Sequence, residues 1–132
     1  RERALIREIS RFHDTRLEPL LRAYFAQVAP ETRDQAFVTS NAIMLQRRLD
    51  QLNQIASPAP LLFGDQLTIA DCGFVASFAL IETLQDILGF DLTIPEPLRA
   101  YERALVTHPS VATQSANYYE ALSSWATTNL AG

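Results

Sequence analysis

Apolar residues recur along this chain every three or four positions, which is the spacing that places side chains on one face of an α-helix. No segment alternates apolar and polar residues with the period of two that a strand requires. The expected fold class is therefore all-α, with four or five helices. They are expected over about 3–28, from about 30 to the break SPAPLLFGDQ, over 68–88, over about 95–107, and around 118–125.

The first two predicted helices are long and joined by few residues, so we expect them to run antiparallel. Pro19 lies inside the first helix and should bend it, because proline has no N–H and its ring clashes with the preceding turn. Pro30 suits the first position of the second helix. The chain has no internal repeat and no linker that would divide it, so residues 1–132 are expected to form a single domain.

The stretch LLFGDQLTIADCGFVASF contains the clearest helix start. Thr68 and Asp71 have the spacing of a capping box, in which Thr68 accepts from the amide of residue 71 and the carboxylate accepts from the amide of Thr68. Leu67 and Cys72 hold the positions of a hydrophobic staple. The residues from Cys72 to Ile81 carry no charge, which predicts a helix buried on nearly all sides, with the cysteine in the core. Thr68 and Asp71 are therefore assigned a structural role.

Two segments resemble the C-terminal, all-helical domain of bacterial-type cytosolic glutathione transferases. GDQLTIAD at 64–71 is similar to the start of that family's central helix, and PEPLRAYERALVTHPSV at 95–111 is similar to its later, proline-led helix. The resemblance extends from about Ile6 to about Thr113. It implies a bundle of about five helices that lacks the family's N-terminal thioredoxin-like domain. The chain opens at Arg1 without a methionine, so we expect it to be a fragment of a longer protein.

In that family the thioredoxin-like domain binds glutathione and supplies the residue that activates its thiol. The resemblance assigns to this chain the binding of a small hydrophobic electrophile and part of a dimer interface. The implied partners are the N-terminal domain of the same polypeptide and a second copy of the chain, with glutathione as co-substrate of the parent enzyme. The chain alone is expected to bind no cofactor, to supply no catalytic residue and to be inactive.

The resemblance also suggests residues near the substrates, through the segment ISRFHDTRLEPLL. Asp14 and Thr15 fall where several transferase classes place a polar residue near glutathione, and Asp14 would accept a hydrogen bond from the glutathione ammonium. Arg11 would offer positive potential to a carboxylate of the tripeptide, or pair with Asp14. The alternative reading is a solvated helix face with i,i+3 and i,i+4 ion pairs among Arg11, Asp14, Glu18 and Arg22.

Four aromatic side chains are candidates for the wall of the electrophile pocket: Phe12, Phe25, Tyr118 and Trp125, the last two as a lid. The alternative is that they belong to the core, which is the commoner role for aromatic residues at helical spacing. His13 lies on the apolar face of the first helix, so we expect a hydrogen-bonded packing residue.

Composition and charge exclude several other classes of function. The 15 acidic residues outnumber 11 scattered arginines, so no basic stripe offers a surface to nucleic acid. A single cysteine excludes an internal disulfide framework and a cysteine-based zinc cluster. His13 and His108 show no cysteine or carboxylate at metal-ligand spacing, so no metal site is expected. Without a membrane-spanning run or a signal-peptide core, the expected location is the cytoplasm, with no membrane partner.

A second class of function stays open. Domains that resemble this one serve as protein-association modules, without catalysis, in translation elongation factors and some aminoacyl-tRNA synthetases. Those modules commonly join lysine-rich partners or linkers, whereas every basic residue of this chain is an arginine. This difference favours the transferase interpretation over the association module.

Overall fold

The fold was analysed in a computed structural model that describes residues 2–130, apart from the side chains of Gln114, Asn129 and Leu130. The predicted domain bounds of 1 and 132 thus lie outside the described residues. Helical elements account for most of the chain, and no strand occurs within 2–130, so the predicted all-α class is confirmed. The elements are α1 (Glu2–Phe12), the π-helical turn η1 (His13–Leu17), α2 (Glu18–Arg22), the 3₁₀ turns η2 (Phe25–Gln27) and η3 (Pro30–Thr32), α3 (Gln35–Ile55), α4 (Ile69–Leu88), α5 (Glu96–Thr107) and α6 (Ala112–Leu130).

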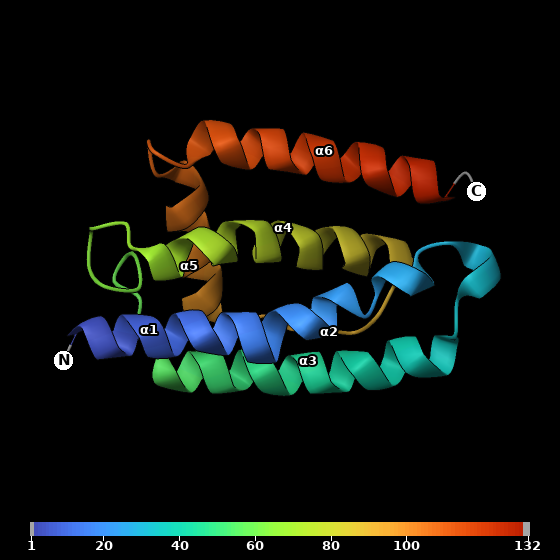
Figure 1. Cartoon of the computed structure of the whole chain (residues 1–132), viewed down its shortest axis with the longest axis horizontal. Helices are drawn as coiled ribbons and strands as arrows, with labels where there is room; N and C mark the ends of the chain where they lie inside the picture. The colour runs from blue at the N-terminus through green and yellow to red at the C-terminus, as the bar shows by residue number, and fades with distance from the viewer. Residues whose placement is uncertain (1, 131–132) are drawn as a thin grey trace.

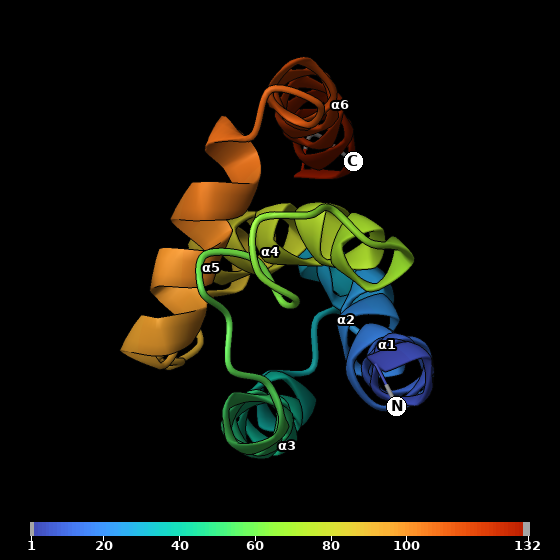
Figure 2. The same cartoon turned by 90° about the vertical axis from the view of Figure 1, so that its left-hand side faces the viewer.

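The helices are arranged around α4. As predicted, α1 and α2 run in one direction and α3 returns in the opposite one (Figure 1). Viewed along these helices, α4 lies between α6 and the pair formed by α1 and α3, while α5 crosses one side of the bundle (Figure 2). Helix α4 contacts α1, α2, α5 and α6 directly. It is therefore the element that the other helices enclose.

The predicted burial of α4 is confirmed for its middle, where five successive residues, 77–81, are all buried. The helix ends at Gly89 as predicted, because φ there is +68°, a left-handed conformation that glycine adopts without strain. The prediction for Cys72 is wrong, since its side chain is exposed, and Ile69 is 75% exposed. In the first turn only Ala70 and Asp71 are buried, so the cysteine does not enter the core.

The prediction of one bent helix over 3–28 is wrong in detail. The α-helix stops at Phe12, and a π-helical turn follows in which the N–H of Glu18 donates to the carbonyl of His13. Pro19 follows at the start of α2, where the missing N–H of a proline does little harm. The chain leaves the helix after Arg22, and the next core residue is Tyr24.

The second helix also begins later than predicted. Pro30 opens a short 3₁₀ turn, and α3 starts only after Asp34. Asp34 Oδ1 accepts hydrogen bonds from the amides of Ala36 at 3.1 Å and Phe37 at 3.3 Å, which makes it the N-cap. The bounds predicted for the fourth helix agree with α5, and α6 covers the last predicted segment.

Candidate functional site

The predicted capping box is present at the start of α4 and is more extensive than the sequence indicates. Asp71 is fully buried, and its Oδ2 accepts from the amide of Thr68 at 2.7 Å and from the Thr68 hydroxyl at 3.0 Å. Its Oδ1 accepts from the hydroxyl of Tyr101 in α5 at 2.7 Å and from the amide of Leu62 at 3.4 Å. One carboxylate thus joins α4, α5 and the loop before α4.

The surroundings of Asp71 also affect Tyr101. Burial raises the pKa of the Tyr101 hydroxyl, and the neighbouring Asp71 carboxylate raises it further. The hydroxyl therefore stays protonated and keeps donating to the carboxylate. These contacts link three parts of the fold, and the structural role of Thr68 and Asp71 stays a prediction.

A second polar array links η1 to the centre of α4. His13 is 6% exposed, and its ring lies edge-on against Phe74, with the ring centroids 4.8 Å apart. Its Nε2 lies 2.6 Å from the hydroxyl oxygen of Ser77, and its Nδ1 lies 2.8 Å from Oδ1 of Asp14. The prediction that His13 is a hydrogen-bonded packing residue is confirmed.

The two partners of His13 fix which ring nitrogen carries the proton of a neutral imidazole. An ionised carboxylate can only accept, so Nδ1–H donates to Asp14. The Nε2 lone pair then accepts from the Ser77 hydroxyl. For a neutral His13 the order of donation is thus Ser77 to His13 to Asp14, and we call these three residues the Ser77–His13–Asp14 relay.

Gly73 makes room for this relay. A Cβ atom at position 73 would lie 2.8 Å from Cε1 and 3.0 Å from Nδ1 of His13, closer than carbon and nitrogen atoms approach without a bond. The ring therefore lies directly against the α4 backbone. Gly73 and Ser77 are four residues apart and share one face of α4, where they form the seat of the imidazole.

The relay has the donor order of a serine hydrolase, but its surroundings do not suit that reaction. Ser77 is 4% exposed and lies in the middle of α4, so a substrate has no access to its hydroxyl. An array buried in this way orients side chains rather than attacking a substrate.

Glu18 adds a second carboxylate beside the relay. Ligand atoms of His13, Asp14 and Glu18 lie within 4.8 Å of one another, so the expectation that no carboxylate has metal-ligand spacing around His13 is wrong. The π-helical turn brings residues 13 and 18, five apart, to the same side. Both ends of this group are already engaged, since Nδ1 bonds Asp14 and Glu18 Oε1 accepts from Arg22 at 2.7 Å. We assign no metal to it.

Three of the predicted site residues meet in one groove. This groove of about 420 Å³ lies between the end of α1 and the end of α3. Thr15 and Arg11 are also linked directly, because the Thr15 hydroxyl donates to the Arg11 carbonyl at 2.7 Å. The residues that line the groove are Glu8, Arg11, Phe12, Thr15, Arg16, Gln51, Gln54 and Ile55. Asp14 is not among them.

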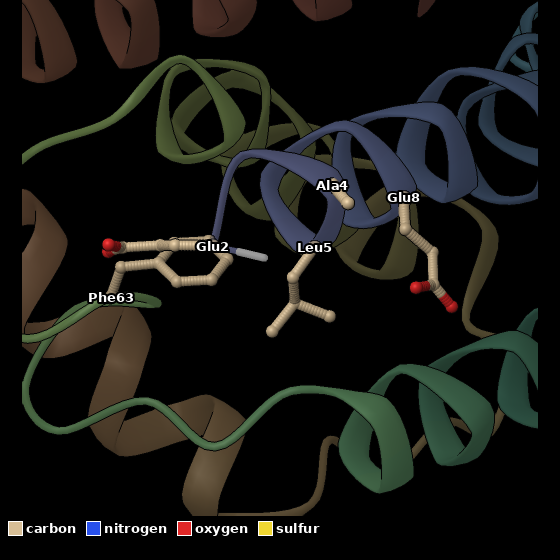
Figure 3. Close-up of a pocket in the computed structure, with 5 residues that line it drawn as sticks. All are labelled: Glu2, Ala4, Leu5, Glu8 and Phe63. Atoms are coloured by element: carbon tan, nitrogen blue, oxygen red, sulfur yellow. The ribbon is translucent and has the colours of Figure 1, made fainter.

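A second groove of about 650 Å³ lies beside the first turns of α1, and Glu8 borders both. Figure 3 shows Leu5 and Glu8 extending from α1, with Phe63 reaching the same space from the loop before α4. Leu5 is 39% exposed and Ile55, in the first groove, is 36% exposed. The edge of the bundle formed by α1 and the end of α3 thus combines apolar side chains with charges, and we call it the α1/α3 edge.

The predicted aromatic wall is divided. Trp125 of α6 packs edge-to-face on Phe25, with ring centroids 5.4 Å apart, and neither lines the groove that contains Phe12. Burial raises the pKa of the Tyr118 hydroxyl on α6, and the charge of the Glu18 carboxylate raises it further. The predicted substrate-proximal residues therefore occupy three places: the groove, the relay and the contact between α6 and the chain after α2.

Sequence reasoning missed Ser77 and Gly73. The pattern that could have found them is a glycine and a serine four apart on one face of an uncharged helical run, because these two small side chains leave space for a neighbouring ring. The position of the π-helical turn has no comparable pattern in the sequence.

Comparison of the chain with protein-family models, curated proteins and solved structures finds no match. No described helix combines the length and the apolar character needed to cross a lipid bilayer.

Proposed function

We propose that this chain is the electrophile-binding and dimerising helical domain of a bacterial-type glutathione transferase. The observation that carries the proposal is the Thr68–Asp71 capping box, with its buried carboxylate, at the start of the enclosed helix α4. Both the capping box and its place on the central helix were expected from the resemblance. The same proposal includes glutathione as co-substrate, a homodimer and a cytoplasmic location.

The α1/α3 edge supports this proposal. Leu5 and Ile55 expose apolar surface there, next to a groove lined by Arg11, Phe12 and Thr15. Exposed apolar side chains rimmed by charges are typical of surfaces that meet another domain or subunit. In the proposal the thioredoxin-like domain, or a second copy of the chain, covers this edge. The residue that activates the thiol comes from the thioredoxin-like domain.

The test compares the native gene product with the 132-residue chain. The intact mass of the native product is measured and any residues before Arg1 are sequenced; both proteins are then assayed for conjugation of glutathione to chlorodinitrobenzene. We expect an additional domain with a Ser, Tyr or Cys near the end of its first strand. We expect conjugation by the native product and none by the 132-residue chain.

Two results would contradict the proposal. A native product that starts near Arg1 and conjugates no electrophile would favour the protein-association module. Conjugation by the 132-residue chain, abolished by a substitution within it, would contradict the argument that a missing domain activates the thiol.

A further inference from the structure

We propose that the groove between α3 and the segment joining α4 to α5 binds the carboxyl-terminal end of an extended peptide of a partner protein. The backbone of Asp91 pairs with the peptide backbone, Ile43 contacts an apolar side chain, and Arg47 binds the terminal carboxylate. The groove has a volume of about 510 Å³ and shares no lining residue with the two grooves of the α1/α3 edge. The inference goes beyond the transferase function and does not depend on it.

The segment between α4 and α5 has the backbone geometry of an extended strand. The carbonyl oxygens of Phe90 and Leu92 both accept from the side-chain amide of Gln85 on α4, at 3.2 and 3.3 Å, so they point to the same side. Thr93 bonds on the other side, to Gln46 of α3. Its N–H donates to Oε1 and its carbonyl accepts from Nε2, both at 2.8 Å. Such alternation is typical of extended backbone.

The same alternation places the backbone polar groups of Asp91 on the groove side. In an extended chain, residues two apart direct their N–H and carbonyl groups to the same side, so those of Asp91 face α3 as those of Thr93 do. Within residues 2–130, neither group of Asp91 has a hydrogen bond. Asp91 is exposed and lines the groove. Its N–H and carbonyl are therefore available to an added strand, a common mode of peptide recognition.

Gln46 determines where the peptide ends. Its side-chain amide bonds both backbone groups of Thr93, so it occupies the place of the next hydrogen-bonding residue of an added strand. Pairing at Asp91 thus cannot continue to Thr93. The neighbour of Gln46 in α3 is Arg47, which lines the groove, is exposed and forms no ion pair in the described part of the chain. A guanidinium at the end of the paired region suits a terminal carboxylate and repels a terminal ammonium.

The length and the apolar surface of the groove also suit a short peptide. Its α3 wall extends from Gln35 to Arg47, which is about 18 Å at the rise of an α-helix, or about five extended residues. Ile43 lies one helical turn before Arg47 and is 56% exposed. An apolar last side chain can pack on it while the carboxylate meets the guanidinium. The Asp91 carboxylate favours a basic over an acidic side chain in the peptide.

The test measures binding of a fluorescein-labelled peptide, Gly-Ser-Lys-Thr-Ile, to the native gene product by fluorescence polarisation. Two peptides with a carboxamide end are compared with it: one of the same sequence, and one with aspartate in place of the threonine. We expect a dissociation constant below about 1 mM for the free carboxylate. Both carboxamides should bind at least about tenfold more weakly, the usual effect of losing a hydrogen bond to a charged group.

Arg47→Gln and Arg48→Gln form a matched pair of variants. The two residues are neighbours on α3, but only Arg47 lines the groove. Neither is buried, so we expect both variants to fold. Arg47→Gln should weaken binding of the free carboxylate about tenfold and leave binding of the carboxamide unchanged. Arg48→Gln should change neither.

Amide hydrogen exchange followed by NMR tests the backbone pairing. At a peptide concentration ten times the dissociation constant, only about a tenth of the protein is free. We therefore expect exchange of the Asp91 amide to slow about tenfold. The Thr93 amide, which already donates to Gln46, should exchange at an unchanged rate.

Equal affinity for the free carboxylate and either carboxamide would overturn the inference, as would an unchanged affinity in Arg47→Gln or unchanged exchange of the Asp91 amide in the bound protein. Absence of binding up to about 1 mM would overturn it too. If Ile43→Glu then converts a dimer into a monomer in light scattering, the groove is an interface between two copies. None of these results alters the conjugation assay, so the inference and the proposed function can fail separately.

Discussion

Asp71 shows how much one buried side chain can determine. A carboxylate removed from water is costly unless hydrogen-bond donors surround it. Asp71 has no arginine beside it in the hydrogen-bond network described above; it is satisfied by two amides and two hydroxyls. Asp71 therefore accepts from the free backbone amide at the start of α4. The same side chain also holds α5 and the preceding loop against α4.

We expect Asp71→Ala to lower the free energy of unfolding by about 3 kcal/mol, because it leaves the Thr68 amide, the Leu62 amide and the Tyr101 hydroxyl buried without an acceptor. Urea denaturation monitored by circular dichroism measures the loss. Asp91→Ala is the matched control, since Asp91 is exposed and the change should stay within about 0.5 kcal/mol. Equal losses for the two variants would contradict the role given to Asp71.

The capping pair could be predicted from the sequence because its two residues are three positions apart and interact through local backbone geometry. The partnership of Asp71 with Tyr101 could not, since it depends on how α5 crosses α4. The exposure of Cys72 was mispredicted for a related reason. An uncharged run indicates burial of a helix as a whole, but which side of its first turn faces solvent depends on the neighbouring elements.

At the scale of elements, the contact of the π-helical turn η1 with α4 depends on a residue that is unfavourable for a helix. Gly73 lies inside α4, where glycine costs about 1 kcal/mol relative to alanine. The His13 ring occupies the space of the missing Cβ. The sequence predicted both helices but not this contact, because the π-helical turn that aims His13 at α4 is set by packing rather than by helix propensity.

A double-mutant cycle tests this contact. Gly73→Ala in the native background should destabilise the protein by about 1–3 kcal/mol, because the new methyl group overlaps the ring. In the His13→Ala background the same substitution should stabilise by up to about 1 kcal/mol, since only helix propensity remains. Thermal denaturation of the four proteins gives both values. A destabilisation of the same size in both backgrounds would show that the ring is not what Gly73 accommodates.

At the scale of the whole molecule, tyrosine side chains join distant parts of the bundle. Tyr24 donates to the carbonyl of Val38 at 3.0 Å and stacks on Phe90, and Tyr119 of α6 donates to Glu82 of α4 at 3.3 Å. Burial is the main cause that raises the pKa of Tyr24 and of Tyr119 to about 12, and the charge of Glu82 adds to it for Tyr119. Tyr101 and Tyr118 are shifted in the same direction.

These shifts predict alkaline unfolding. A tyrosine with a higher pKa in the folded state contributes its full stabilisation while the pH is below about 10, the pKa of tyrosine in the unfolded chain. As the pH rises above that value, the unfolded chain releases the proton first, and the stabilisation is lost. We expect the melting temperature to change little from pH 8 to 9.5 and to fall steeply between about pH 10 and 12.

Lysine side chains, which titrate in the same pH range as tyrosine, do not contribute to this measurement, because all 11 basic residues are arginines. Melting curves followed together with tyrosinate absorbance would check it. Tyr101→Phe should make the decline shallower, as it removes one of the shifted groups. A melting temperature that stays constant up to pH 12 would contradict the burial of these hydroxyls.

The Asp71 network also has a consequence for the order of events in time. Thr68 is three residues from Asp71, so their bonds close within one nascent helical turn, whereas Tyr101 is thirty residues away and arrives only when a long loop has closed. Before α5 docks, Oδ2 can already accept from Thr68, whereas Oδ1 has only the longer bond from the Leu62 amide and needs water in place of the Tyr101 hydroxyl. We therefore expect the start of α4 to stay hydrated until α5 docks and supplies the Tyr101 hydroxyl.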